Sequence, residues 1–283
     1  MLLKFGLLPG ESTPVVLARN QALRAHLERA LDIEVELVVG ATYAATGEAL
    51  RQGRIDIAFL GPVAYALQSR RAPLEPFARP THARVGPTFQ AVILVPADSP
   101  VRSLADLRGQ DIALGDLAST SGSWVPRYQL LEAGLMADRD YARRMLGAHD
   151  KVALAVAQRT VAAGGLSKPI YLRLLQEGRL DPDAVRVLAV SPAIPEYMWT
   201  FRAGMDPVFS EALRQAFVRI RDPQVLAVYR AESFIPAVDS DVDRVRHWME
   251  AILQARLGPS PLPWTPIESM IRWNHARDNA LAS

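Results

Sequence analysis

Residues 111–122 read Asp-Ile-Ala-Leu-Gly-Asp-Leu-Ala-Ser-Thr-Ser-Gly, and they determine which fold we expect. The apolar run that ends at Gly115 is typical of a short buried strand, and the polar residues after it are typical of a turn. A helical pattern of about three turns follows and stops at Gly134. Strand, turn and helix in this order are the repeating unit of α/β folds.

The same alternation of strand and helix extends back to the N-terminus. Leu2–Leu8 is apolar and ends at the turn signal Pro9-Gly10, so it is predicted to be the first strand. Pro14–Leu31 carries apolar residues at helical spacing. The pattern then predicts a strand at Ile33–Val39, a helix at Thr46–Gln52 and a buried strand at Ile55–Leu60. This order favours a parallel sheet in an α/β fold.

A second α/β region is expected to begin after Gln90 and to return near Met198. Strands are predicted at Ala91–Val95, Val161–Gly164 and Val185–Val190, and helices at Ser103–Leu107, Val152–Gln158 and Ile170–Glu177. The last third is predicted to hold the strand Met198–Arg202 and the helices Pro207–Arg221, Pro223–Arg230 and Asp241–Leu257. After these, the proline-rich connector Gly258–Pro266 leads to a terminal amphipathic helix.

The composition is that of a folded protein with a hydrophobic core, since 49% of the 283 residues are hydrophobic and 22% are charged. The net charge of only +2 argues against a nucleic-acid partner, because such proteins normally carry a clustered basic excess. The absence of cysteine excludes disulfides, thiolate metal sites and cysteine nucleophiles. The five histidines are scattered without metal-binding spacing, and no cofactor is expected.

No part of the sequence is expected to insert into a membrane. No stretch approaches the ~20 apolar residues of a membrane span. The first residues show neither the charged region nor the apolar region of an export signal. Composition alone therefore leaves two alternatives, a cytoplasmic protein or an exported protein whose signal is not part of this chain.

The hydroxyl-rich turn carries the strongest chemical signal. Ser119, Thr120 and Ser121 precede Gly122 at the start of a predicted helix. The first N–H groups of a helix have no internal partners, and the helix dipole adds positive potential there. Three hydroxyl donors and a glycine that permits close approach would suit a tetrahedral oxyanion. The alternative is an ordinary helix cap, because serine and threonine are favoured at that position anyway.

An ordered series of segments resembles the phosphonate, phosphite and phosphate-binding branch of the substrate-binding proteins of ABC transporters. The resemblance runs from residue 2 to about residue 235. Its segments are Pro9, Asp-Ile-Glu-Val-Glu-Leu-Val at 32–38, Ala-Thr-Tyr-Ala-Ala at 41–45, Gly-Arg-Ile-Asp-Ile-Ala-Phe-Leu-Gly-Pro at 53–62, Asp98-Ser99-Pro100, Leu104–Gly109, Ser119–Gly122, Gly147–Asp150 and Val187–Pro195. Their common order is more specific than any one motif.

The resemblance implies a type II periplasmic-binding-protein fold, in which two α/β lobes close on a ligand about a hinge of two crossing strands. On that pattern one lobe comprises residues 1–93 and 199–283, and the other comprises residues 94–198. The crossing strands are expected at Val92–Val95 and Met198–Arg202. The family also implies a periplasmic or extracytoplasmic location, a membrane permease as partner and a monomeric state.

The resemblance also implies a binding site. Ser119, Thr120 and Ser121 match the residues that hold the phosphonate oxygens. Tyr43 matches a tyrosine that reaches across from the first lobe, and His149 matches a histidine of the second lobe. A histidine beside a bound dianion is expected to favour its charged form. Each residue has a plainer alternative, since Tyr43 and His149 also suit core or capping positions.

Departures from the family pattern bear on the ligand. Members that bind aminoalkylphosphonates carry two carboxylates, and our alignment places Pro169 and Tyr197 at those positions. A second family tyrosine is replaced by Phe89, and Glu196 lies beside one carboxylate position but is expected to face away. A buried ammonium without a carboxylate partner is costly, so phosphite, methylphosphonate or phosphate is favoured. Lys168 would instead favour a second negative group on the ligand.

Two other functions remain open at this point. A hydrolase would need Asp116, Ser119 and His149 to act as a triad, but serine at a helix start without a sharp turn is poorly activated. A sensor would use the same binding domain to report an oxyanion to a signalling partner, with the tail 259–283 as a docking helix. No motif of a nucleotide-binding loop, a nucleophile elbow or a zinc protease is present.

Overall fold

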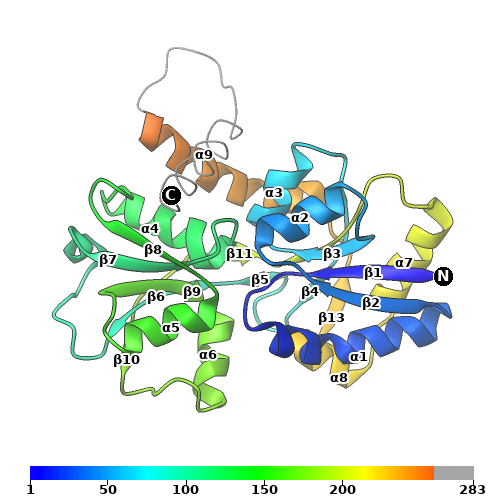
Figure 1. The fold of residues 1–283 in the computed structure, drawn as a ribbon, viewed down its shortest axis with the longest axis horizontal. Helices are drawn as coiled ribbons and strands as arrows, with labels where there is room; N and C mark the ends of the chain where they lie inside the picture. The colour runs from blue at the N-terminus through cyan, green and yellow to red at the C-terminus, as the bar shows by residue number, and fades with distance from the viewer. Residues whose placement is uncertain (258–283) are drawn as a thin grey trace, which may run out of the picture.

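The computed structural model describes residues 1–257 and consists of two α/β lobes (Figure 1). The first lobe is built on a six-stranded sheet and the second on a five-stranded sheet. The connector Gly258–Pro266 and the terminal helix predicted after it lie outside the described residues.

The six-stranded sheet has the order β13-β4-β12-β3-β1-β2. Its strands are β1 (Leu2–Leu7), β2 (Glu34–Val39), β3 (Ile57–Leu60), β4 (Glu75–Thr81), β12 (Met198–Phe201) and β13 (Ser233–Ile235). Strand β1 pairs in parallel with β2 and β3, whereas β12 runs antiparallel to β3 and β4. The parallel part is the one predicted from the sequence.

Helices cover both faces of this sheet. Helices α1 (Thr13–Leu31), α7 (Pro207–Val218) and α8 (Pro223–Tyr229) bury aliphatic and aromatic side chains against one face. The other face is covered by α2 (Tyr43–Arg51), α3 (Pro62–Ser69) and α9 (Asp243–Leu257), with the 3-10 turn η3 (Asp239–Val242) before α9. The stack of Phe77 on Phe201, with ring centroids 3.9 Å apart, lies in the first of these two cores.

The five-stranded sheet has the order β10-β6-β9-β7-β8. Its strands are β6 (Ala91–Pro96), β7 (Asp111–Gly115), β8 (Ala142–Gly147), β9 (Ala163–Ser167) and β10 (Val185–Val190). The helical elements of this lobe are the 3-10 turn η1 (Leu104–Leu107), the π-helical turn η2 (Thr120–Trp124), α4 (Val125–Glu132), α5 (His149–Ala157) and α6 (Lys168–Gln176). Strand β7 runs parallel to β8 and β9, while β6 is antiparallel to β9 and β10.

The chain crosses between the lobes at a two-stranded ribbon. Strand β5 (Thr88–Phe89) pairs antiparallel with β11 (Ile194–Pro195). The crossings expected at Val92–Val95 and Met198–Arg202 were therefore misplaced, because these runs lie in β6 and β12, inside the two sheets. A ribbon of two-residue strands is too short to produce a strand pattern in the sequence. The lobe boundaries 1–93, 94–198 and 199–283 stay a prediction.

Some elements differ from the sequence prediction. The helix expected to run from the hydroxyl-rich turn to Gly134 is divided into η2 and α4, and β9 begins two residues later than expected. Helix α3, strand β4 and strand β8 were missed. Strand β4 contains two prolines, which normally argue against a strand. Helix α3 begins with proline as its first residue, so Gly61-Pro62 looked like a turn and nothing more.

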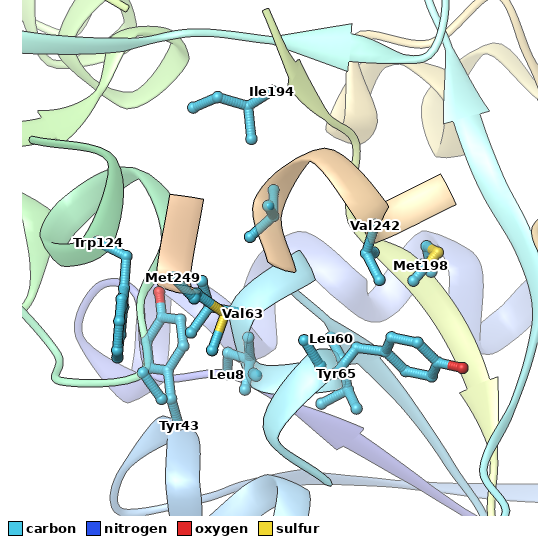
Figure 2. Close-up of a cluster of buried hydrophobic side chains, with 14 of the residues drawn as sticks. Leu8, Tyr43, Leu60, Val63, Tyr65, Trp124, Ile194, Met198, Val242 and Met249 are labelled. Atoms are coloured by element: carbon cyan, nitrogen blue, oxygen red, sulfur yellow. The ribbon is translucent and has the colours of Figure 1, made fainter. Parts of the chain in front are cut away.

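Helix α9 contacts both lobes. It packs on α3 and η3 of the first lobe and on α4 and η2 of the second (Figure 1). Tyr128 of α4 stacks on Trp248 of α9 with ring centroids 5.6 Å apart. Trp248 belongs to an apolar cluster, part of which is drawn in Figure 2, and this cluster joins Tyr43 and Leu60 of the first lobe to Trp124 of the second. The lobes are thus in apolar contact along one side of the interface between them.

Candidate functional site

The hydroxyl-rich turn follows β7 and faces the first lobe. Ser119, Thr120 and Ser121 are fully buried. Ser119 Oγ accepts a hydrogen bond of 3.1 Å from the N–H of Gly122, so Ser119 is the helix cap that the plainer interpretation expected. The turn itself is π-helical, a conformation that is often found at functional sites.

Thr120 connects the two lobes. Its Oγ1 accepts a hydrogen bond of 2.9 Å from the N–H of Val63, the second residue of α3. A second hydrogen bond nearby also joins the two lobes, because Asp116 Oδ2 accepts a hydrogen bond of 3.1 Å from the N–H of Tyr43. The turn therefore meets the N-terminal ends of two first-lobe helices, α2 and α3.

Ser121 has a buried hydroxyl that is not satisfied. Its Oγ has no hydrogen-bond partner within residues 1–257, and the same is true of Ser123 Oγ. A buried polar group left unpaired costs about 1–3 kcal/mol. Such groups usually mark the place of a water or a ligand.

Two tyrosines face these hydroxyls. Burial raises the pKa of Tyr43 well above its usual range, and the neighbouring Tyr197 adds to the rise while the Ser119 hydroxyl opposes it. Burial also raises the pKa of Tyr197, against the effects of the Tyr43 and Ser121 hydroxyls. Both phenols therefore stay protonated and can donate hydrogen bonds.

His149 begins α5 on the second-lobe side of the site. Its side chain accepts a hydrogen bond at Nδ1 from the N–H of Ser167, 3.3 Å away, so the ring proton lies on Nε2. Burial lowers the pKa of His149 to about 4. The imidazole of His149 is therefore neutral at neutral pH in this structure, and its charged form beside a dianion stays a prediction.

Two glycines permit the close packing around this histidine. A Cβ atom on Gly122 would lie 2.8 Å from Cε1 of His149 and 2.9 Å from Ser119 Oγ. A Cβ atom on Gly10, in the loop after β1, would lie 3.0 Å from the Tyr43 hydroxyl. The carbonyl of Gly10 also accepts a 3.2 Å hydrogen bond from the N–H of His149, which is a further contact between the lobes.

A cavity of about 200 Å³ opens between the lobes beside this cluster. Tyr43, Phe89 and Tyr197 line it from the first lobe and the hinge, and Ser167 and Pro169 line it from the second lobe. The rings of Phe89 and Tyr197 meet edge to face at 5.8 Å. The three hydroxyl residues of the turn do not line the open volume. Tyr43 and Tyr197 do line it, and their hydroxyls interact with those of Ser119 and Ser121.

The structure thus brings together the residues predicted for the site. Five of them form one hydroxyl and imidazole cluster, namely Tyr43, Ser119, Ser121, His149 and Tyr197. Thr120 lies beside the cluster, and Phe89 lies on the cavity wall. Their contact with a ligand stays a prediction.

Charged residues at the entrance of the cavity were missed by sequence reasoning. Glu11, Arg19, Arg173, Glu196 and Arg230 line it. Only the position of Glu11, after the turn signal Pro9-Gly10 at the end of a parallel strand, could have indicated a site, because ligands of α/β folds bind at that end.

Two charged side chains near the cavity bear on the ligand. Lys168 Nζ donates a 2.9 Å hydrogen bond to Gln90 Oε1, and its effect on a second negative group of the ligand stays a prediction. Glu196 does line the cavity instead of facing away. Both of its oxygens are nevertheless engaged, one by His82 Nε2 at 2.9 Å and one by the N–H of Tyr197 at 3.0 Å.

The arrangement does not support a hydrolytic triad. The oxygens of Asp116 accept hydrogen bonds from the backbone of Tyr43 and Ala118, and His149 Nδ1 accepts one from Ser167. Asp116 therefore does not orient the imidazole as a triad would require. Within the described residues, no group of three or more metal-ligating side chains is present, and no helix is long and apolar enough to span a membrane.

Comparison with known proteins identifies the family of the chain. Residues 5–242 match the family model described as ABC transporter, phosphonate, periplasmic substrate-binding protein. The chain is 26% identical to the phosphate-import protein PhnD of Mycolicibacterium smegmatis, over 85% of this chain and 82% of that protein. It is 25% identical to the phosphonates-binding periplasmic protein of Escherichia coli, over 83% of this chain and 71% of that protein.

Solved structures share the fold. A binding protein component of an ABC phosphonate transporter from Pseudomonas aeruginosa superposes with a TM-score of 0.84 at 22% identity, covering 99% of this chain and 95% of that chain. PhnD1 from Prochlorococcus marinus in complex with methylphosphonate superposes with a TM-score of 0.82 at 20% identity, covering 89% of this chain and 98% of that chain.

Proposed function

Because the chain belongs to the family of periplasmic substrate-binding proteins of phosphonate ABC transporters, we propose that it captures a small phosphorus oxyanion between its lobes and delivers it to an ABC permease. Members of this family bind small phosphonates and work with permease components, and they are not enzymes. In this proposal residues 94–198 form one lobe, and residues 1–93 and 199–283 form the other.

The observation that carries the proposal is the unpaired, fully buried hydroxyl of Ser121. It lies with the hydroxyls of Tyr43 and Tyr197, which stay protonated, and with His149, whose Nε2 carries the ring proton. These groups are neutral donors at neutral pH. A set of preorganised donors without a carboxylate among them suits an anion with several oxygens.

The ligand we favour is phosphite, methylphosphonate or phosphate. The relatives support this range, since one is a phosphate-import protein and another structure holds methylphosphonate. Pro169 and Tyr197 line the cavity where an aminoalkylphosphonate would need carboxylates. An ammonium group placed there would lose its water without gaining a partner.

The test is isothermal titration in phosphate-free buffer, after bound anions have been removed by partial unfolding and dialysis. We expect one of phosphite, methylphosphonate and phosphate to bind with a Kd of about 1 μM or lower, near −8 kcal/mol. Sulfate is the control for a general anion site and is expected to bind far more weakly. Absence of binding by every phosphorus ligand would refute the proposal. Tight binding of 2-aminoethylphosphonate would show that the assignment of Pro169 and Tyr197 is wrong.

A further inference from the structure

The cavity is larger than a bare oxyanion requires. Its volume is about 200 Å³, whereas a cavity needs only about 10–15 Å³ on this measure to hold one water. Phosphite and methylphosphonate would leave most of this space to solvent. The wall beyond the two tyrosines therefore has room to contact a substituent of the ligand.

The carboxylates of that wall are already paired. Glu11 is 7% exposed, and its carboxylate binds the guanidinium groups of Arg19, Arg173 and Arg179. A cationic substituent would have to compete with these arginines. Glu11 therefore offers little to an ammonium group.

Glu196 is neutralised by His82. Nδ1 of His82 lies 2.9 Å from the carbonyl oxygen of Arg230, and Nε2 lies 2.9 Å from a carboxylate oxygen of Glu196. Both partners are acceptors, so both ring nitrogens must donate, and only the protonated imidazole can do so. Glu196 is thus paired at contact distance with His82, whereas its attraction for Arg230 acts over a longer distance.

Within residues 1–257, Arg230 makes no ion pair at contact distance, and Glu196 is the acidic group that attracts it from farther away. It ends α8 in the left-handed conformation, with φ at 52°, which is uncommon for a residue other than glycine. The hydrogen bond from His82 to its carbonyl holds the backbone in place. Its side chain lines the cavity.

Building on the proposed function, we propose that Arg230 recognises a second anionic group on the ligand, so that among phosphonates with a larger substituent the site prefers one whose substituent bears a carboxylate. The phosphonate lies at the hydroxyl cluster, and its carboxylate reaches the wall that Arg230 and Tyr197 line. A guanidinium pairs well with a carboxylate because it can offer two parallel N–H donors.

The test compares three phosphonates of similar size by isothermal titration, namely 3-phosphonopropionate, propylphosphonate and 2-aminoethylphosphonate. We expect 3-phosphonopropionate to bind at least about tenfold more tightly than propylphosphonate, and 2-aminoethylphosphonate to bind most weakly. The variant Arg230→Gln is expected to abolish the preference and leave methylphosphonate binding unchanged. Arg221→Gln, an exposed arginine that does not line the cavity, is the matched control and should keep the preference.

Equal binding of 3-phosphonopropionate and propylphosphonate would overturn this inference, and so would a preference that survives in Arg230→Gln. In either case, intact methylphosphonate binding would leave the proposed function standing. Failure of all phosphonates, phosphite and phosphate to bind would instead refute the proposed function, and the inference with it.

Discussion

The carboxylate of Glu11, which lies after β1 in the first lobe, binds the guanidinium of Arg173, which lies on α6 of the second lobe. Arg179 adds a second contact from the same lobe, with Nη1 at 3.4 Å from Glu11 Oε1. Arg19 of the first lobe binds the same carboxylate and also Glu177 across the interface. A single buried carboxylate thus holds together arginines of both lobes at the entrance of the cavity.

Replacing Glu11 with glutamine should weaken the contact between the two lobes. Three guanidinium groups would then face one another without the carboxylate between them, and breaking a buried ion pair is costly. Since the arginines are partly exposed, we expect a modest loss of about 1–2 kcal/mol in ligand binding. Titration should show a rise in Kd of about tenfold, and small-angle scattering should show a more open molecule. Glu211→Gln on α7 is the control, and equal effects of the two substitutions would contradict this role.

Ser119→Ala and Ser121→Ala should differ in their effects on stability. Ser119 caps the helical turn, so its loss should lower the free energy of unfolding by about 1 kcal/mol. Ser121 Oγ has no partner within the described chain, so Ser121→Ala should leave stability unchanged or raise it slightly. Both variants should bind the ligand more weakly. Thermal unfolding without ligand and titration with ligand separate the two effects, and a destabilised Ser121→Ala would contradict the assignment.

His149 should make stability depend on pH in the acid range. Burial lowers its pKa to about 4 in the folded protein, whereas an unfolded histidine titrates near about 6.5. The unfolded chain therefore binds the additional proton first, and stability falls as the pH drops from about 6.5 to about 4. The difference corresponds to about 3 kcal/mol. His149→Gln should flatten this slope in urea unfolding followed at several pH values, whereas His26→Gln on α1 should not.

His82 should make the stability of the folded protein fall as the pH rises, which is the opposite of the effect of His149. The hydrogen bond to Glu196 is the main cause that raises its pKa above the usual value. Protonated His82 therefore stabilises the folded protein fully at low pH. This stabilisation is lost as the pH rises through the raised pKa of His82. We expect the melting temperature to fall between neutral and alkaline pH, and His82→Asn to remove this decline. An unchanged slope in the variant would show that another group is responsible.

The strands and helices with a clear hydrophobic period could be predicted from the sequence. Helix α1 and strands β1, β2 and β3 differ from their predictions by at most two residues. Strand β8 was missed because Arg143 and Arg144 interrupt its apolar pattern. These arginines form ion pairs with Asp138 and Asp111 along the edge of the sheet. Tertiary partners of this kind cannot be deduced from local periodicity.

The hydroxyl and imidazole cluster was predictable for a different reason. Ser119, Thr120 and Ser121 stand together in the sequence, and resemblance to a family supplied Tyr43, His149 and Tyr197. Glu11 and Arg173 are 162 residues apart, and neither belongs to a motif. Their relationship depends on how two lobes meet, so the sequence alone contained no local signal for it.

The contact of α9 with both lobes has a consequence for the speed of binding. Tyr128 and Trp248 must separate, together with the apolar cluster around Trp124, before the interface can widen. A ligand that enters only after this separation associates no faster than the protein opens. We therefore expect an association rate constant well below the diffusional ceiling of about 10⁸–10⁹ M⁻¹s⁻¹ for a small ligand. Substituting Trp248 with a smaller side chain would then accelerate uptake and release together, so the helix sets the residence time of the bound molecule.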